Sequence, residues 1–325
     1  MRTKLFGVGI AILLTCGLII APTGFDLVFG AETLKFGTSL RTSPHHALPL
    51  LAATEKGFWK REGLDAEWVP FRSGRSFYRA MAAKALKIGF SGAISAIRSS
   101  SRGIPVIIVA DLKLKKHDFY VYVRTDSAIK KPLDLKGAKI GIARFGGVVH
   151  AYGRVVVKSL GIEKEMKLVA GGGVLQELAA LRSGTLDGKV SDFFTMAPLV
   201  GEGVVRELLS INDFLPRRWI DVVIVSRTDF LKTNKADVKK MVRGVLKARD
   251  FVTENREWAL EKIRTYSGYK GEVAKAVNNA VNYGKGGQID SKALENVRNF
   301  LIEYGVLKEE ETVPLDKLYT KEITG

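Results

Sequence analysis

The stretch from Leu48 to Gly74, LPLLAATEKGFWKREGLDAEWVPFRSG, contains first a helical pattern and then a strand pattern, with a glycine in the turn after each. Leu48–Arg61 carries apolar residues at helical spacing, whereas Leu64–Pro70 alternates acidic and apolar residues as strands do. Gly63 and Gly74 stand in the turns, where glycine is common. A helix, a turn and a strand in succession predict part of a layered α/β fold.

The same alternation extends over much of the chain and predicts mainly parallel sheets flanked by helices. Further strands are expected at Thr33–Thr38, Lys87–Phe90, Val106–Ala110, Lys139–Ile142, Met166–Ala170 and Leu186–Ser191. Further helices are expected at Ser76–Lys84, Ala93–Ser101, Gly147–Ser159 and Val174–Ser183. The last part is mostly helical, with helices expected at Lys235–Thr253, Glu257–Tyr266, Glu272–Tyr283 and Ser291–Tyr304.

Two β-rich segments resemble each other, FYVYVRTD at 119–126 and DVVIVSRTD at 221–229. Chance similarity between two short strands is one explanation. The other is that they are the two places where the chain crosses between two lobes. This second hypothesis predicts one discontinuous lobe over 32–118 plus 227–325, and one inserted lobe over 119–226.

Residues 1–30 have the three parts of a secretory signal peptide. Arg2 and Lys4 precede the apolar run Phe6–Ile20, and small residues follow near Ala31. We expect export to the periplasm or cell envelope, with an uncleaved membrane anchor as the alternative. Cys16 is the only cysteine and lies in this run, so the exported chain would have no disulfide and no thiolate.

Composition and missing motifs narrow the function classes. The net charge of +17 would attract anions. The basic residues are spread along the whole chain, without an aromatic RNA-binding motif or zinc-finger spacing, so we expect no nucleic-acid partner. The sequence contains no G-x-S-x-G, HExxH or Walker A motif. We therefore expect no catalytic residue, no cofactor and no metal site.

Five turns follow the carboxyl ends of expected strands, where open α/β sheets bind ligands. Helices that begin there present free N–H groups and a positive dipole end, which suit an anionic group. Arginines in these turns would hold such a group through two hydrogen bonds, and a histidine would add another. The expected ligand contacts are Ser39, Arg41, His45, His46, Ser73, Gly74, Ser91, Gly92, Ala93, Arg144, Phe145, Gly146, Gly147, Val148, Ser191 and Asp192.

The segment KGFWKREGLDAEWVPFRSG resembles the hallmark of periplasmic substrate-binding proteins of ABC importers, of the nitrate, sulfonate, taurine and thiamine-precursor type. The segments KIGFSGAISAIRSSSRGIPVIIVA, LDLKGAKIGI at 133–142 and ALRSGTLDGKVSDFFTMAPL at 180–199 extend the resemblance over nearly the whole exported chain. It implies a type II periplasmic-binding-protein fold, in which two α/β lobes close on a ligand through two hinge segments. Lys84, Lys87 and the stretch RTSPHH depart from the family pattern and leave the ligand open.

The leading hypothesis is a monomeric, non-enzymatic protein that captures a small, anionic organic molecule and delivers it to the membrane subunits of an ABC permease. A ligand-sensing subunit for a membrane receptor is the second hypothesis. The third is an enzyme resembling thiamine-pyrimidine synthases. Such relatives use a cysteine-rich iron motif, which is absent from this sequence.

Overall fold

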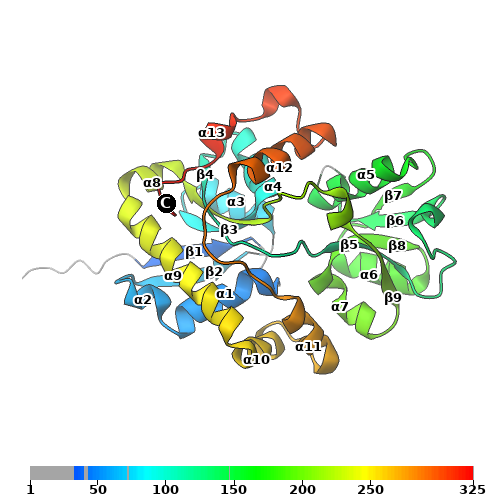
Figure 1. The fold of residues 1–325 in the computed structure, drawn as a ribbon, viewed down its shortest axis with the longest axis horizontal. Helices are drawn as coiled ribbons and strands as arrows, with labels where there is room; N and C mark the ends of the chain where they lie inside the picture. The colour runs from blue at the N-terminus through cyan, green and yellow to red at the C-terminus, as the bar shows by residue number, and fades with distance from the viewer. Residues whose placement is uncertain (1–32, 40–42, 72, 146, 325) are drawn as a thin grey trace, which may run out of the picture. The chain divides into compact units, whose positions relative to one another are not determined.

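Two five-stranded sheets organise the chain from Thr33 onward (Figure 1). The computed structural model describes residues 33–324 apart from 40–42, 72 and 146, so the expected signal peptide over 1–30 lies outside the described residues. Within the described part of the chain, no helix is both long and apolar enough to cross a lipid bilayer.

The first sheet has the strand order β2-β1-β3-β10-β4. β1 pairs in parallel with β2 and β3, whereas β10 pairs antiparallel with β3 and β4. Only β10 therefore opposes the common strand direction. The strands are β1 (Leu34–Thr38), β2 (Ala66–Pro70), β3 (Ile88–Gly92), β4 (Val106–Asp111) and β10 (Val222–Arg227).

The second sheet repeats this arrangement with the order β7-β6-β8-β5-β9. β6 pairs in parallel with β7 and β8, and β5 pairs antiparallel with β8 and β9. The strands are β5 (Phe119–Arg124), β6 (Lys139–Ile142), β7 (Lys167–Ala170), β8 (Gly188–Asp192) and β9 (Val205–Ser210).

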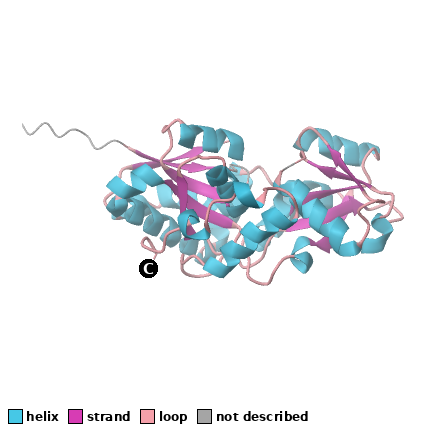
Figure 2. Ribbon diagram, turned by 90° about the horizontal axis from the view of Figure 1, so that it is seen from above, coloured by secondary structure: helices cyan, strands magenta, loops and turns pink. Residues whose placement is uncertain are grey.

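Helices lie on both sides of each sheet, which confirms the α/β class expected from the alternation (Figure 2). The α-helices are α1 (Pro44–Glu55), α2 (Phe58–Arg61), α3 (Gly74–Ala82), α4 (Ala93–Ser101), α5 (Val148–Leu160), α6 (Val174–Ser183), α7 (Phe193–Gly201), α8 (Thr228–Thr233), α9 (Lys235–Glu254), α10 (Arg256–Tyr266), α11 (Gly271–Ala280), α12 (Ser291–Glu303) and α13 (Leu315–Leu318). Three short 3-10 helices are η1 (Pro132–Leu135), η2 (Ile211–Phe214) and η3 (Glu309–Glu311).

The strands β5 and β10, whose sequences resemble each other, hold equivalent places in the two sheets. Each is the strand that opposes the others of its sheet. The pairing register shifts at the same point of both, between Val121 and Tyr122 in β5 and between Ile224 and Val225 in β10. Such an irregularity at one position of two strands is a shared design feature of the two sheets.

The Arg-Thr-Asp ending that these two strands share also has the same structure in both. Arg124 forms an ion pair with Asp126, and Arg227 forms one with Asp229. The similarity is therefore carried by structure as well as by sequence. β10 pairs within the first sheet, so residues 222–226, expected in the inserted lobe, contribute to the first sheet.

One expected helix is divided in the structure. The pattern over Leu48–Arg61 predicts a single helix, but the structure ends α1 at Glu55 and begins α2 at Phe58. Gly57 separates them with φ of 65°, a left-handed conformation that glycine adopts at little cost. The expected helix was therefore wrong at this point, because a helix-terminating glycine overrides the apolar spacing around it.

A single apolar cluster contains side chains of both sheets and of the helices beside them. Phe300 of α12 is 4% exposed and packs against the rings of Tyr152 in α5 and Trp219. Burying a phenylalanine contributes several kcal/mol, since its loss leaves a cavity that neighbours fill incompletely. The helix α12 thus joins apolar groups from distant parts of the chain.

We expect Phe300→Ala to lower the free energy of unfolding by about 3–5 kcal/mol, because it removes this buried ring. Urea unfolding monitored by circular dichroism measures the change. The matched control is Phe145→Ala, which removes a ring that is 61% exposed and should change stability by less than about 0.5 kcal/mol. Equal effects of the two substitutions would contradict the role given to Phe300.

Candidate functional site

Two segments connect the sheets, and both end at an aspartate. The first crossing (residues 112–118) lies between β4 and β5, and the second crossing (residues 211–221) lies between β9 and β10. The carbonyl oxygen of Asp221 accepts a hydrogen bond of 2.7 Å from the N–H of Ala93, the first residue of α4. The carbonyl oxygen of Asp118 accepts one of 2.8 Å from Phe193, the first residue of α7. Each crossing therefore fixes the start of one helix.

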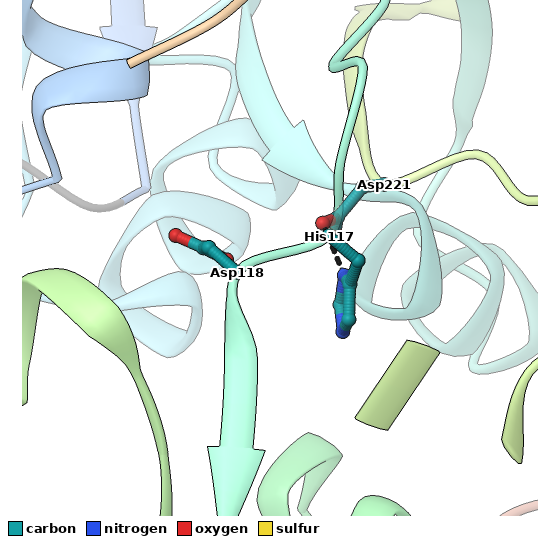
Figure 3. Close-up of side chains that lie close together, drawn as sticks. All are labelled: His117, Asp118 and Asp221. Carbon is teal, nitrogen blue, oxygen red and sulfur yellow. Dashed lines mark hydrogen bonds and ion pairs between the residues drawn. The ribbon is translucent and has the colours of Figure 1, made fainter. Parts of the chain in front are cut away.

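The side chains of the two crossings also meet. His117 Nδ1 lies 2.5 Å from Asp221 Oδ2, so a hydrogen bond joins the first crossing to the second (Figure 3). His45 of α1 places its Nδ1 3.7 Å from Asp118 Oδ2. His117, Asp118 and Asp221 each have one atom that could bind a metal ion, and these three atoms lie within 4.8 Å of one another. We name His45, His117, Asp118 and Asp221 the crossing cluster.

The two adjacent histidines of α1 are buried and neutral. His46 Nδ1 is 3.1 Å from Thr38 Oγ1, and the ring of His45 stands edge-on to Phe194 with centroids 4.7 Å apart. Burial lowers the pKa of His45 to about 3 and that of His46 to about 4. At neutral pH both imidazoles therefore act as hydrogen-bonding groups without charge.

The pKa values of the two carboxyl groups in the crossing cluster are shifted in opposite directions. Burial, together with the negative charges of Asp192 and Asp221, raises the pKa of Asp118 well above its ordinary value. Burial also tends to raise the pKa of Asp221, but the charge and hydrogen bond of His117 outweigh it and lower that pKa. The cluster thus favours one protonated carboxyl beside one carboxylate.

Several expected contacts of the first sheet come together beside this cluster. Gly92, which precedes α4, is placed so that an added Cβ would lie 3.8 Å from the Asp221 carbonyl oxygen. Ser91 accepts a hydrogen bond of 2.8 Å from the hydroxyl of Tyr78. The N–H of Ser39 donates to the Phe90 carbonyl oxygen in the neighbouring strand. The ring of His46 stands edge-on to Phe90 with centroids 5.9 Å apart, so Ser39, His46 and Ser91 gather around the end of β3, which leads into α4.

The turn before α3 has a different environment. The hydroxyl of Ser73 accepts a hydrogen bond from the Ser76 N–H and so caps this helix. A Cβ on Gly74 would lie 3.9 Å from Ser95 Oγ of α4, which places the turn beside that helix. Arg41 and Gly146, two further expected contacts, lie outside the described residues.

The turn before α5 is basic and open. Gly147 precedes α5 without a side-chain cap, and Val148 at its start is half-buried. Phe145 is 61% exposed and stands edge-on to His150. Burial lowers the pKa of Arg98 in α4, and the positive charges of Arg102 and Arg144 lower it further. Positive charge therefore collects between α4 and this turn.

The turn before α7 is acidic. Asp192 caps this helix by accepting hydrogen bonds from the Thr195 N–H at 2.9 Å and from its hydroxyl at 2.7 Å. Ser191 is buried and pairs with Tyr120 in the neighbouring strand. Because a carboxylate already occupies the positive end of α7, this helix start suits a hydrogen-bond donor better than an anion.

Three residues of the site were absent from the sequence-based expectation, namely His117, Asp118 and Asp221. The similarity between the two segments that end in Arg-Thr-Asp could have identified both aspartates, because the same similarity predicted the crossings. An aspartate directly precedes both FYVYVRTD and VVIVSRTD, and it stands at the same position relative to each Arg-Thr-Asp. His117 has no counterpart in the second segment, where Ile220 stands, so the repeat does not reveal it.

Two cavities lie away from these turns. One has a volume of about 360 Å³ and is bordered by Arg124 of β5 and Arg182 of α6. The other, of about 540 Å³, is bordered by Phe214, Asn296 and Tyr304. None of the expected ligand contacts borders either cavity.

Comparison with known proteins places this chain. The model of the family described as NMT1/THI5 like matches residues 43–259. A Brucella abortus protein named as a binding protein is 25% identical over 215 residues, which is 64% of this chain and 64% of that protein. A Saccharomyces cerevisiae protein named 4-amino-5-hydroxymethyl-2-methylpyrimidine phosphate synthase is 20% identical over 250 residues, covering 68% of this chain and 67% of that protein.

A solved structure shares the fold. The periplasmic aliphatic sulphonate binding protein SsuA of Escherichia coli superposes with a TM-score of 0.76 at 17% identity, covering 88% of this chain and 91% of that chain. This likeness confirms the periplasmic-binding-protein fold that the sequence resemblance implied. At such low identity it supports the fold and not the ligand.

The buried histidines predict how stability depends on pH. In the unfolded chain His46 has an ordinary pKa near 6.5, but in the folded protein it is about 4. As pH falls, the unfolded state therefore takes up a proton on His46 before the folded state does. This lowers the free energy of unfolding by up to about 3 kcal/mol between pH 6.5 and 4. His46→Asn has no imidazole to protonate, so its free energy of unfolding should not fall in this way. We therefore expect the difference in stability between the wild type and His46→Asn to shrink by about 3 kcal/mol from pH 6.5 to pH 4.

Urea unfolding at a series of pH values measures both proteins. His150→Asn is the control, since His150 is half-buried and should give a smaller pH-dependent difference. A difference between wild type and His46→Asn that stays constant from pH 7 to pH 4 would contradict a buried, neutral His46.

Proposed function

The chain belongs to the NMT1/THI5-like family, and from that premise we propose that it is an exported solute-binding protein of an ABC importer. It captures a small, anionic organic molecule between two lobes and delivers it to the membrane subunits of a permease. The observation that carries this proposal is the pair of equivalent sheets joined by two crossings. Two connections of this kind allow one body to rotate against the other as a hinge.

The lobes of this proposal follow the strand pairing. The first comprises residues 33–118 and 222–325, and the second comprises the inserted residues 119–221. The hydrogen bonds that α7 donates to the Asp118 carbonyl oxygen and α4 donates to the Asp221 carbonyl oxygen link each crossing to a helix start. A rotation about the crossings would therefore carry these helix starts with it. A ligand that contacts both lobes favours the closed arrangement and shifts the population toward it.

The anionic character of the solute rests on the basic side of the site. The helices α4 and α5 begin at glycines without a side-chain cap. Apart from the Ala93 N–H, which donates to the Asp221 carbonyl oxygen, their first turns offer N–H groups and positive dipole ends. In the described part of the chain, neither Arg98 nor Arg144 forms an ion pair with a carboxylate. Positive charge without an ion-pair partner, on Arg144 before α5 and on Arg98 in the last turn of α4, supports binding of a carboxylate, sulfonate or phosphate group.

The proposal places the protein in the periplasm or cell envelope as a monomer. The expected signal over 1–30 supports export, and the structural relative SsuA is titled a periplasmic binding protein. A catalytic role is not part of the proposal, although one group of relatives is named as synthases. Without a cysteine after Cys16, the exported chain has no thiolate to hold iron.

Ligand binding tests the proposal directly. We expect at least one member of a panel of sulfonates, carboxylates, phosphates and pyrimidines to raise the melting temperature of the chain from Ala31 onward. Saturation with that ligand should also reduce the radius of gyration in small-angle X-ray scattering, since closure makes the protein more compact. Absence of stabilisation by every compound, with turnover of any of them, would favour an enzyme instead.

A second prediction concerns the start of α4. A Cβ at Gly92 meets no atom closer than 3.8 Å, so Gly92→Leu should fold. Its side chain would block approach to the N–H groups that follow Ala93 in the first turn of the helix, and we expect affinity for the stabilising ligand to fall at least tenfold in calorimetry. Ala83→Leu, on the exposed end of α3, is the control and should bind normally. Unchanged affinity of Gly92→Leu would show that the ligand binds elsewhere.

A further inference from the structure

A proline inside α7 leaves one backbone carbonyl oxygen without its usual helical partner. In an α-helix each carbonyl oxygen accepts from the N–H four residues later, and Pro198 has no N–H to donate to the Phe194 oxygen. The hydroxyl of Tyr269, from the segment before α11, donates to this oxygen at 2.7 Å. Because Phe194 belongs to the second lobe and Tyr269 to the first, this hydrogen bond joins the two lobes.

The same arrangement occurs within the first lobe. Pro49 of α1 has no N–H for the His45 carbonyl oxygen, and the hydroxyl of Tyr283 donates to that oxygen at 3.0 Å. Tyr269 precedes α11 and Tyr283 follows it, so one short segment completes both helices. The rings of His45 and Phe194 also stand edge-on to each other, with centroids 4.7 Å apart. The α11 segment therefore ties the start of α7 to the start of α1.

Close packing reinforces this attachment of α7. Phe194 is 2% exposed and Ala197 is 3% exposed, and both belong to an apolar cluster whose other buried side chains come from the first lobe. A Cβ added to Gly201, at the end of α7, would lie 2.5 Å from Cγ2 of Val273 in α11, so glycine permits a close approach of the two helices. A buried contact that also satisfies a carbonyl freed by proline is costly to separate.

The contact of α5 with α12, which also joins the two lobes, is looser. Its ion pair between Lys158 and Glu303 has side chains that are 50% and 55% exposed, and such pairs add little stability because water and salt screen them. Phe300 packs against Tyr152 there through an apolar contact, which is not directional. The cavity of about 540 Å³ lies beside this contact and is bordered by residues of both helices. This side of the molecule therefore has room for movement.

We infer that Tyr269 is a positioning residue that keeps the start of α7 against the first lobe, so that the second lobe turns about α7. The inference deepens the proposed function and rests on it, because it takes the two lobes to rotate. The expected contacts Ser191 and Asp192, directly before α7, then stay close to the first lobe. The turn before α5, with Arg144, is the part that swings toward α4 or away from it.

Distances between paired spin labels test this inference without any added solute. The chain from Ala31 onward has no cysteine, so pairs of introduced cysteines can be labelled. Glu257→Cys, at an exposed position of α10 in the first lobe, is combined with Glu202→Cys after α7 (the α7 pair) or with Lys164→Cys beyond α5 (the α5 pair). Double electron–electron resonance should give a distance distribution about twofold wider for the α5 pair, because the α7 pair lies at the axis.

Tyr269→Phe should widen the distribution of the α7 pair about twofold, because the Phe194 carbonyl oxygen loses its donor. Tyr283→Phe is the matched control, since it removes the equivalent hydrogen bond within the first lobe and should leave the α7 pair unchanged. Gly201→Ala should also widen the α7 pair through overlap with Val273, and Val273→Ala in the same chain should reverse this by removing the overlapping methyl group. Thermal melts verify that each variant is folded.

The outcomes separate the inference from the proposed function. Equal widths for the α7 pair and the α5 pair in the wild type would overturn the inference, and so would an unchanged α7 pair in Tyr269→Phe. Equal widening by Tyr283→Phe would overturn it as well, since the Tyr269 hydroxyl would then have only a general structural role. If no compound of the binding panel stabilises the protein, the proposed function fails, while the widths of the two pairs still decide where the lobes turn.

Discussion

The two crossings carry the hydrogen bonds on which the rest of the structure depends. Asp118 and Asp221 use their carbonyl oxygens to hold the first N–H groups of α7 and α4. These N–H groups are among those that a helix cannot satisfy internally, so a helix start is a natural place to attach a connecting segment. The bond between His117 and Asp221 then joins the two connections to each other. The orientation of both helix starts thus depends on a few bonds between residues of the crossings.

Charge is divided unevenly over this framework. The chain carries a net charge of +17, yet its most buried ionisable groups around the crossings are carboxyl groups and neutral histidines. Burial explains why His45 and His46 give up their protons and why Asp118 keeps one. A basic surface of this kind attracts anions from a distance. The crossings differ from that surface, because their ionisable groups are withdrawn from water.

Much of the fold follows from local patterns, and α4 and β6 have the bounds that their sequences predict. Apolar spacing and glycine turns decide such elements without reference to distant residues. The interruption at Gly57 was missed because the apolar spacing continues across it. The turns before α4 and α5 were expected from the rule for open sheets, but His117 and its bond to Asp221 were not, since 104 residues separate them.

By itself the sequence determined the order of strands and helices, the family, and the likeness between the two segments that end in Arg-Thr-Asp. These features depend on neighbours along the chain, so periodicity and motif carry them. Only the tertiary structure decided that β10 pairs in the first sheet, and that four residues from α1 and both crossings meet in one cluster. Those contacts arise from strand pairing between distant segments, and the register of that pairing is fixed by the whole buried core.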